Sequence, residues 1–182
     1  MNLPNKLSMF RIILVPVLVV FYYLYVTLSE DIYAYLLAPI FIVASLTDFF
    51  DGYIARKYQL VTVFGKFIDP LADKLIVMAA LIIMNALGFI PYWVTIVILS
   101  REFIVTGIRL VAVGDGKVIA ASKLGKYKTA STMVGLVIML LFPYLNIFLE
   151  IGIWFIYIGT ILTIVSGIDY FIKNKEIILE SI

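Results

Sequence analysis

Long apolar runs separated by short polar breaks make up most of this chain. Six runs approach or reach the roughly 20 residues that cross the hydrocarbon core of a bilayer. They cover about residues 8–28, 33–54, 65–87, 91–113, 129–143 or a little beyond, and 148–172. The breaks carry charged residues, glycine or proline, which typically end helices. The pattern therefore predicts an all-α integral membrane protein, with six transmembrane helices in one domain over residues 1–182.

Composition supports a membrane setting and narrows the possible chemistry. Of the 182 residues, 64% are hydrophobic, whereas a soluble domain is about 45–50% apolar. The chain has no cysteine and no histidine, so disulfides, thiolate sites and histidine ligands are excluded. The N-terminal segment is basic and then apolar, but no small-residue cleavage site follows it. We therefore expect a retained first span with an amphipathic entry.

The charges predict how the helices are oriented. Basic residues gather in the N-terminal segment (Lys6 and Arg11), in the second and fourth connections and in the C-terminal tail. The charged residues in or beside the other connections are all acidic: Glu30, Asp31 and Glu150. With six spans, all the basic clusters fall on one side of the membrane, which the positive-inside rule makes cytoplasmic. We therefore expect a multi-pass protein of the cytoplasmic membrane with both termini inside.

Four aspartates stand at the facing ends of two neighbouring predicted helices. Asp48 and Asp51 are spaced i, i+3 near the end of the second run, and Asp69 and Asp73 are spaced i, i+4 at the start of the third. With about 3.6 residues per turn, each pair shares one helix face. Because the connection is short, the two helices are expected to run antiparallel, with all four carboxylates in one gap.

Four carboxylates in one gap repel one another unless cations lie between them. Divalent ions such as Mg²⁺ or Mn²⁺ prefer oxygen ligands, and two ions that share carboxylates fit this ligand count better than one. The alternative is that the acids pair with cations nearby in the sequence: Arg56, Lys57, Lys66 and Lys74. Gly52 and Gly65 stand where something approaches the backbone closely, which favours the metal site. A dinuclear site at a membrane surface indicates phosphoryl transfer, for which a lipid-linked pyrophosphate is a suitable substrate.

The acidic stretch resembles a family signature. It reads Asp48-x-x-Asp51-Gly52-x-x-Ala55-Arg56, eight residues, then Gly65-x-x-x-Asp69-x-x-x-Asp73, and is similar at every fixed position to the motif of the CDP-alcohol phosphotransferase family. The segments "LPNKLSMFRIILVPV", "GKFIDPLADK", "REFIVTGIRL" and "KLGKYKT" resemble its bacterial phosphatidylglycerophosphate synthase branch. Ser8 stands where that branch has threonine, so a hydroxyl is kept.

The resemblance implies a fold and a metal centre. It implies six transmembrane helices, an amphipathic N-terminal helix, a polar cavity open to the cytosol and a homodimer. It further implies two divalent cations, Mg²⁺ or Mn²⁺, bridged by Asp48 and Asp69. Asp51 would complete the first ion's ligands, and Asp73 would contact the second ion and act as general base.

The resemblance also implies substrates. The headgroup of CDP-diacylglycerol would contact Gly52, Arg56 and Thr62, with Asn5 and Ser8 as further contacts. The primary hydroxyl of sn-glycerol 3-phosphate, deprotonated by Asp73, would attack the lipid-bearing phosphorus, and CMP would leave. No nucleic acid partner is expected.

Further polar residues occur in the second half of the chain. Arg109, Lys126 and Lys128 are expected to bind the acceptor's phosphate, because they lie near the predicted cytosolic side. Arg101 and Glu102 lie midway along the fourth span, where ionisable residues are functional candidates. A structural ion pair with another span is an equally good interpretation of these two.

Other functions are compatible with parts of this pattern. Inositol phosphate, serine or phosphatidylglycerol could replace glycerol 3-phosphate as the acceptor, although a cationic pocket argues against serine. The quoted segments "REFIVTGIRL" and "KLGKYKT" favour glycerol 3-phosphate. A divalent-cation transporter would need acidic residues through the whole membrane depth, whereas these four lie near one face.

Overall fold

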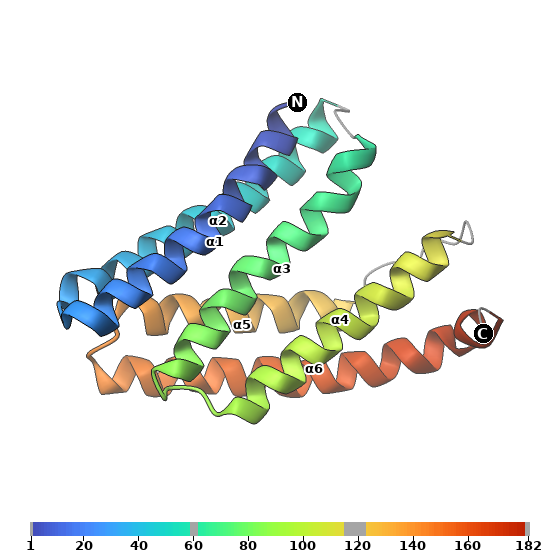
Figure 1. The fold of residues 1–182 in the computed structure, drawn as a ribbon. Coiled ribbons are helices and arrows are strands. Elements are labelled where there is room, and N and C mark those ends of the chain that lie inside the picture. The colour runs from blue at the N-terminus through green and yellow to red at the C-terminus, as the bar shows by residue number, and fades with distance from the viewer. Residues whose placement is uncertain (1, 59–61, 115–122, 181–182) are drawn as a thin grey trace.

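The computed structural model describes residues 2–58, 62–114 and 123–180, with only the backbone described at some helical positions. Within these ranges the chain forms six helices and no strand, as predicted (Figure 1). They are α1 (Leu3–Leu28), α2 (Asp31–Lys57), α3 (Val63–Ala86), α4 (Tyr92–Gly114), α5 (Lys123–Leu141) and α6 (Asn146–Glu180).

Four of the described helices, α1, α2, α5 and α6, are long and apolar enough by composition to cross a membrane. Helices α3 and α4 have 24 and 23 residues, and about 1.5 Å per residue makes them long enough as well. They carry more charge because Lys74, Arg101, Glu102 and Arg109 line an internal cavity. The chain is a multi-pass membrane protein, and the prediction that α3 and α4 also span stays a prediction.

Capping residues join the beginnings of α1 and α3. The Asn2 side chain accepts a hydrogen bond from the backbone N–H of Asn5 (3.3 Å), and Thr62 Oγ1 accepts one from the backbone N–H of Gly65 (2.9 Å). Such caps satisfy N–H groups that have no partner within the helix. Asn5 Nδ2 also donates to Thr62 Oγ1 (3.0 Å). A Cβ at position 65 would lie 2.8 Å from Asn5 Oδ1, so glycine permits this close approach.

Helices α1, α2 and α3 form one half of the bundle, where α1 packs against both others. Its buried core is aliphatic and aromatic, and includes Leu18, Leu37, Phe41 and Ile76. Large aromatic side chains face outward on both halves of the bundle: Tyr23 of α1, Tyr92 of α4 and Trp154 of α6 are 65%, 71% and 66% exposed. Large exposed apolar surfaces are expected where a protein meets lipid.

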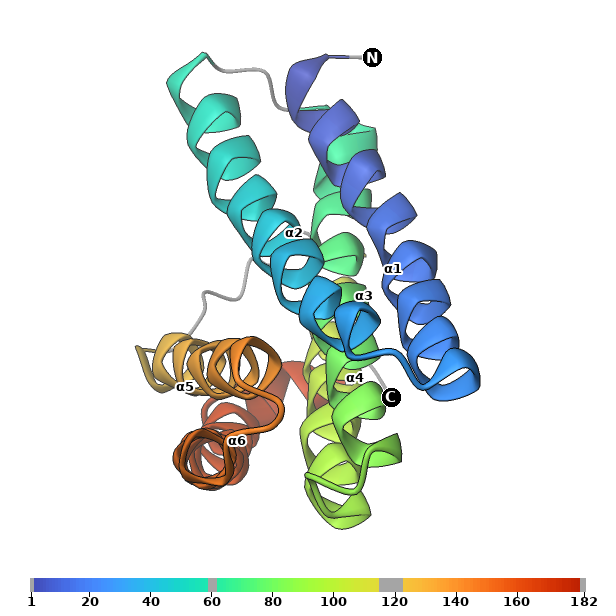
Figure 2. The same cartoon turned by 90° about the vertical axis from the view of Figure 1, so that its left-hand side faces the viewer.

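Helices α5 and α6 form a tight hairpin that crosses the other helices steeply; Figure 2 shows these two nearly end-on. Glycines allow their backbones to approach. A Cβ at Gly135 would lie 2.7 Å from the carbonyl oxygen of Gly152, and one at Gly159 would lie 2.5 Å from Thr132 Oγ1 and 3.3 Å from the carbonyl oxygen of Lys128. Small residues support such close helix contacts in membranes, and here they fix the position of Lys128.

We expect Gly135→Ala to destabilise the protein, because the added methyl group meets backbone on α6 that cannot move unless the helices separate. Overpacking of this kind costs about 1–3 kcal/mol. The midpoint of thermal unfolding in detergent measures the effect. Gly107→Ala on α4 is the matched control, since a Cβ there meets no described atom within 4 Å. Equal midpoints for the two variants would contradict the prediction.

Candidate active site

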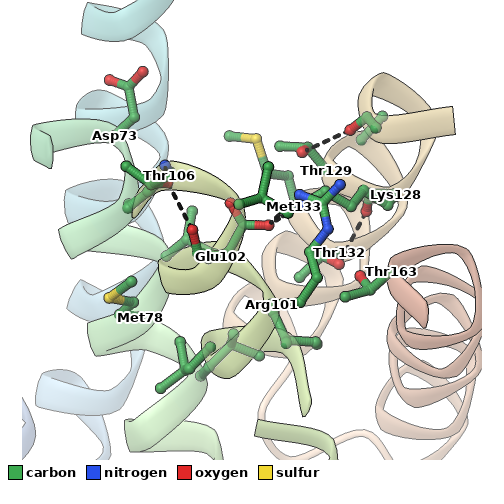
Figure 3. Close-up of a pocket in the computed structure, with 18 of the residues that line it drawn as sticks. Asp73, Met78, Arg101, Glu102, Thr106, Lys128, Thr129, Thr132, Met133 and Thr163 are labelled. Carbon is green, nitrogen blue, oxygen red and sulfur yellow. Dashed lines mark hydrogen bonds and ion pairs between the residues drawn. The ribbon is translucent and has the colours of Figure 1, made fainter. Parts of the chain in front are cut away.

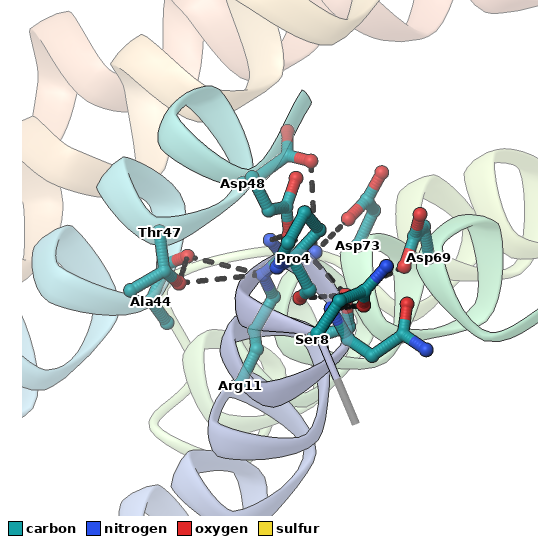
Figure 4. Close-up of polar contacts among 11 residues, drawn as sticks. Pro4, Ser8, Arg11, Ala44, Thr47, Asp48, Asp69 and Asp73 are labelled. Atoms are coloured by element: carbon teal, nitrogen blue, oxygen red, sulfur yellow. Dashed lines mark hydrogen bonds and ion pairs between the residues drawn. The ribbon is translucent and has the colours of Figure 1, made fainter. Parts of the chain in front are cut away.

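The guanidinium of Arg11 lies at the centre of the acidic cluster, defined here as Asp48, Asp51, Asp69 and Asp73. Arg11 is fully buried (0% exposed). Its Nη2 lies 2.5 Å from Asp51 Oδ2, and its Nη1 lies 3.5 Å from Asp48 Oδ1 and also contacts Asp73 Oδ1. Figure 4 shows the guanidinium between carboxylates from two helices. A residue of α1 thus joins the end of α2 to the start of α3.

The third nitrogen of Arg11 anchors the group to the backbone. Arg11 Nε donates to the carbonyl oxygen of Ala44 at 3.2 Å, with Thr47 Oγ1 slightly farther away at 3.5 Å. Among the carboxylates, Asp51 is the buried one (3% exposed). A buried charge of this kind needs a close partner of opposite sign, and Arg11 supplies it.

Asp69 is bound by the hydroxyl group of Ser8 instead of by the guanidinium of Arg11. Ser8 Oγ lies 2.5 Å from Asp69 Oδ1 and 3.4 Å from Asp51 Oδ2. A hydroxyl has one hydrogen to donate, so we assign it to the shorter contact with Asp69. Through Ser8 and Arg11, α1 therefore contacts all four acids.

Arg11, the cation observed among these acids, is not one of the four cations weighed from the sequence. Lys74 instead donates to Thr106, Lys57 lies 5.6 Å from the Tyr58 ring centre, and the side chains of Arg56 and Lys66 lie outside the described residues. In the sequence analysis, Arg11 is only one of the basic residues that predict the orientation in the membrane. A pattern could have found it, because Asn5, Ser8 and Arg11 repeat at intervals of three along a mostly apolar helix.

The acidic cluster has the chemistry of a divalent-cation site. Carboxylate oxygens are ligands that Mg²⁺ and Mn²⁺ prefer, and a positive group already lies among them. In the observed arrangement, no three acidic side chains of the described residues come close enough to hold one ion. The side chains of Asp48 and Asp73 are 44% and 38% exposed, so they have room to turn from Arg11 toward an ion.

Four of the five predicted headgroup residues, Asn5, Ser8, Gly52 and Thr62, lie beside these acids. Asn5 and Thr62 are hydrogen-bonded to each other, and Ser8 is hydrogen-bonded to Asp69. Gly52 follows Asp51 directly in α2. The side chain of Arg56 lies outside the described residues, and the headgroup contacts of all five residues stay predictions.

A cavity of about 880 Å³ opens beside the acidic cluster, and Asp48 and Asp73 form part of its wall; Figure 3 shows the position of Asp73. The rest of the wall comes from helices α3, α4, α5 and α6. Its cationic lining consists of Lys74, Arg101, Arg109, Lys126 and Lys128, and Glu102 is the remaining acid among the lining residues. Two regions of opposite charge therefore adjoin at Asp48 and Asp73.

The mid-span pair Arg101 and Glu102 makes contacts to other helices and also lines the cavity. Arg101 Nη2 donates to Ser166 Oγ of α6 at 3.2 Å, and Glu102 forms an ion pair with Lys128 of α5. The structural ion pair with another helix is therefore present, and a functional role for these two residues stays a prediction.

Arg109 has an unsatisfied donor inside the protein. Its guanidinium carbon lies 5.6 Å from the ring centre of Tyr170, a cation–π distance. Its Nε is buried and has no hydrogen-bond partner among the described residues. Buried polar atoms are rarely left unpaired in proteins, which is consistent with an anion binding beside Arg109.

We expect Arg11→Gln to lower the midpoint of thermal unfolding by several degrees in the presence of a metal chelator. Removing one partner of a buried ion pair leaves the other uncompensated and costs about 3 kcal/mol. Lys6→Gln removes an exposed positive charge from the same helix and is the matched control. A similarly small effect of both substitutions would refute a central role for Arg11.

Comparison with known proteins identifies the family. The family model described as CDP-alcohol phosphatidyltransferase matches residues 1–165, and members of this family use divalent metal ions. A protein of Bacillus subtilis (strain 168) is 45% identical over 96% of both chains, and one of Rickettsia felis is 40% identical over 96% of both chains. One of Haemophilus influenzae is 38% identical over 100% of this chain and 97% of its own. All three are named CDP-diacylglycerol–glycerol-3-phosphate 3-phosphatidyltransferase. The chain thus belongs to the CDP-alcohol phosphatidyltransferase family.

Proposed function

We propose that this protein transfers the phosphatidyl group of CDP-diacylglycerol to the primary hydroxyl of sn-glycerol 3-phosphate, giving phosphatidylglycerophosphate and CMP. The names of its relatives support both substrates. The observation that carries the proposal is the position of Asp48 and Asp73, which belong to the acidic cluster and also line the cationic cavity. A donor at the cluster and an anionic acceptor in the cavity would therefore meet at these two residues.

The acidic cluster is the proposed site for two divalent cations, Mg²⁺ or Mn²⁺, with Asp48, Asp51, Asp69 and Asp73 as ligands. When bound, such cations neutralise charge on the pyrophosphate of the donor and stabilise the leaving CMP. The contacts of Ser8 and Arg11 with these carboxylates support the assignment, since they hold the carboxylate oxygens that would bind the metal ions within one region. The donor headgroup would lie against Asn5, Ser8, Gly52, Arg56 and Thr62.

The acceptor is proposed to lie in the cavity with its phosphate on Arg109, Lys126 and Lys128. Lys128 on α5 lies across the cavity from Asp73 on α3 (Figure 3), and Arg109 of α4 lines the same cavity. This arrangement would point the primary hydroxyl of a phosphorylated alcohol toward Asp73. Asp73 would accept the hydroxyl proton as the new oxygen–phosphorus bond forms, and fixed positions of both reactants would lower the entropic cost.

The proposed location is the bacterial cell membrane, with both termini and the site facing the cytoplasm. The basic clusters of the sequence support this orientation. Figure 1 shows that the N-terminus, the end of α2 and the start of α3 lie at the same end of the bundle. A homodimer, which the resemblance implies, is part of the proposal.

We expect purified protein in nanodiscs, given CDP-diacylglycerol and Mg²⁺ or Mn²⁺, to release CMP with sn-glycerol 3-phosphate. Asp73→Asn should reduce the rate at least about 100-fold, because a positioned base contributes this much or more. Asp169→Asn changes an aspartate that pairs with Lys173 one turn later in α6; it is the matched control and should retain activity. Faster CMP release with inositol phosphate, serine or phosphatidylglycerol would overturn the acceptor assignment, and full activity of Asp73→Asn would remove the proposed base.

A second kinetic experiment tests the phosphate site. Arg109→Met should raise KM for sn-glycerol 3-phosphate about tenfold or more, since it removes charge-assisted hydrogen bonds to the acceptor. KM for CDP-diacylglycerol should change little, because Arg109 lines the cavity whereas the predicted headgroup residues Asn5, Ser8, Gly52 and Thr62 are not among its lining residues. Equal changes in both KM values would show a general structural effect instead of acceptor binding.

A further inference from the structure

Glu102 is an acid within a cationic surface. Its Oε1 contacts Lys128 Nζ and lies 3.5 Å from Arg101 Nη1. The three side chains are largely withdrawn from solvent, with 18% of Glu102, 8% of Lys128 and 14% of Arg101 exposed. Figure 3 shows the carboxylate extending from α4 toward Lys128 on α5. The ion pair therefore lies within the space proposed for the acceptor's phosphate.

The positions of both partners are fixed by their helices. Glu102, Thr106 and Arg109 follow one face of α4 at i, i+4 and i+7, and all three line the cavity. On α5, the carbonyl oxygen of Lys128 accepts a hydrogen bond from Thr132 Oγ1 at 3.0 Å, and Gly159 of α6 approaches it closely. Lys128 is therefore held opposite Glu102 by backbone packing, independently of the ion pair.

The cavity has more donor capacity than Glu102 satisfies. Arg101 Nε and Arg109 Nε are both buried without a hydrogen-bond partner among the described residues. A phosphate group offers several acceptor oxygens and two negative charges, whereas a carboxylate offers one charge. An anion with more oxygens can therefore satisfy donors that Glu102 leaves unpaired.

We propose that Glu102 is a resident anion of the acceptor site, which pairs with Lys128 when no acceptor is bound and releases it to the acceptor's phosphate. This inference rests on the proposed function, because it takes Lys128 as part of the phosphate site. Without the carboxylate, the buried charge of Lys128 would lose the acid that contacts it in the empty cavity, which is costly. Competition from Glu102 weakens the binding of every anion, so only ligands that reach several cations bind well.

Glu102→Gln tests the proposal through binding instead of turnover. We would titrate inorganic phosphate and sn-glycerol 3-phosphate into protein in nanodiscs by calorimetry, without metal or CDP-diacylglycerol. Loss of a competing charged partner should tighten both dissociation constants about tenfold. Glu150→Gln makes the same chemical change at the exposed start of α6 and should leave both constants unchanged.

A double substitution separates competition from indirect effects. In a Lys128→Met background, Glu102→Gln should no longer tighten phosphate binding, because the competition is for the lysine ammonium. Thermal unfolding gives a readout that does not need high affinity. Glu102→Gln should unfold at a lower temperature than the wild type without phosphate, and added phosphate should raise its midpoint more than it raises that of the wild type.

The outcomes distinguish this inference from the proposed function. Phosphate binding by Glu102→Gln that equals or falls below that of the wild type would overturn the inference, as would no detectable phosphate binding or phosphate-induced rise in midpoint with either protein. If CMP release with sn-glycerol 3-phosphate is normal in the wild type, the proposed function survives that result. Conversely, tighter phosphate binding by the variant, with no CMP release from any acceptor by the wild type, would support the resident anion and refute the proposed function.

Discussion

The buried guanidinium of Arg11 is the contact on which the rest of this structure depends. It joins α1 to carboxylates on α2 and α3, where three negative charges would otherwise repel one another. Two like charges about 4 Å apart repel by roughly 4 kcal/mol at the effective dielectric constant of a protein surface. Arg11 therefore explains how a largely apolar helical protein can hold an acidic cluster at one end of its bundle.

Arg11 and Glu102 each carry a charge opposite in sign to that of the region in which they lie. Arg11 is the cation within the acidic cluster, and Glu102 is the acid within the cationic part of the cavity. Each compensates buried charges that await a ligand of its own sign: divalent cations for the acidic cluster and a phosphate for the cavity. A site that is stable while empty and still binds a charged ligand needs such an exchangeable partner, because an uncompensated buried charge is costly.

Helix packing sets the distance between the two regions. The capping contacts among Asn5, Thr62 and Gly65 hold the starts of α1 and α3 together, and this fixes the acidic cluster. The glycine contacts between α5 and α6 fix Lys128 on the other wall. The reacting groups are thus positioned by helices instead of loops, which favours a precise alignment of donor and acceptor.

The sequence by itself determined the helical class, six helices and the sharing of helix faces by Asp48 with Asp51 and by Asp69 with Asp73. These features follow from local periodicity and short connections, and the spaced signature was enough to indicate the family. Only the tertiary structure decided which charges meet. Arg11 pairs with residues 37 to 62 positions away, and Glu102 pairs with Lys128 across two helices. Any of several nearby cations satisfies the local pattern equally well, so the choice among them depends on how the helices pack.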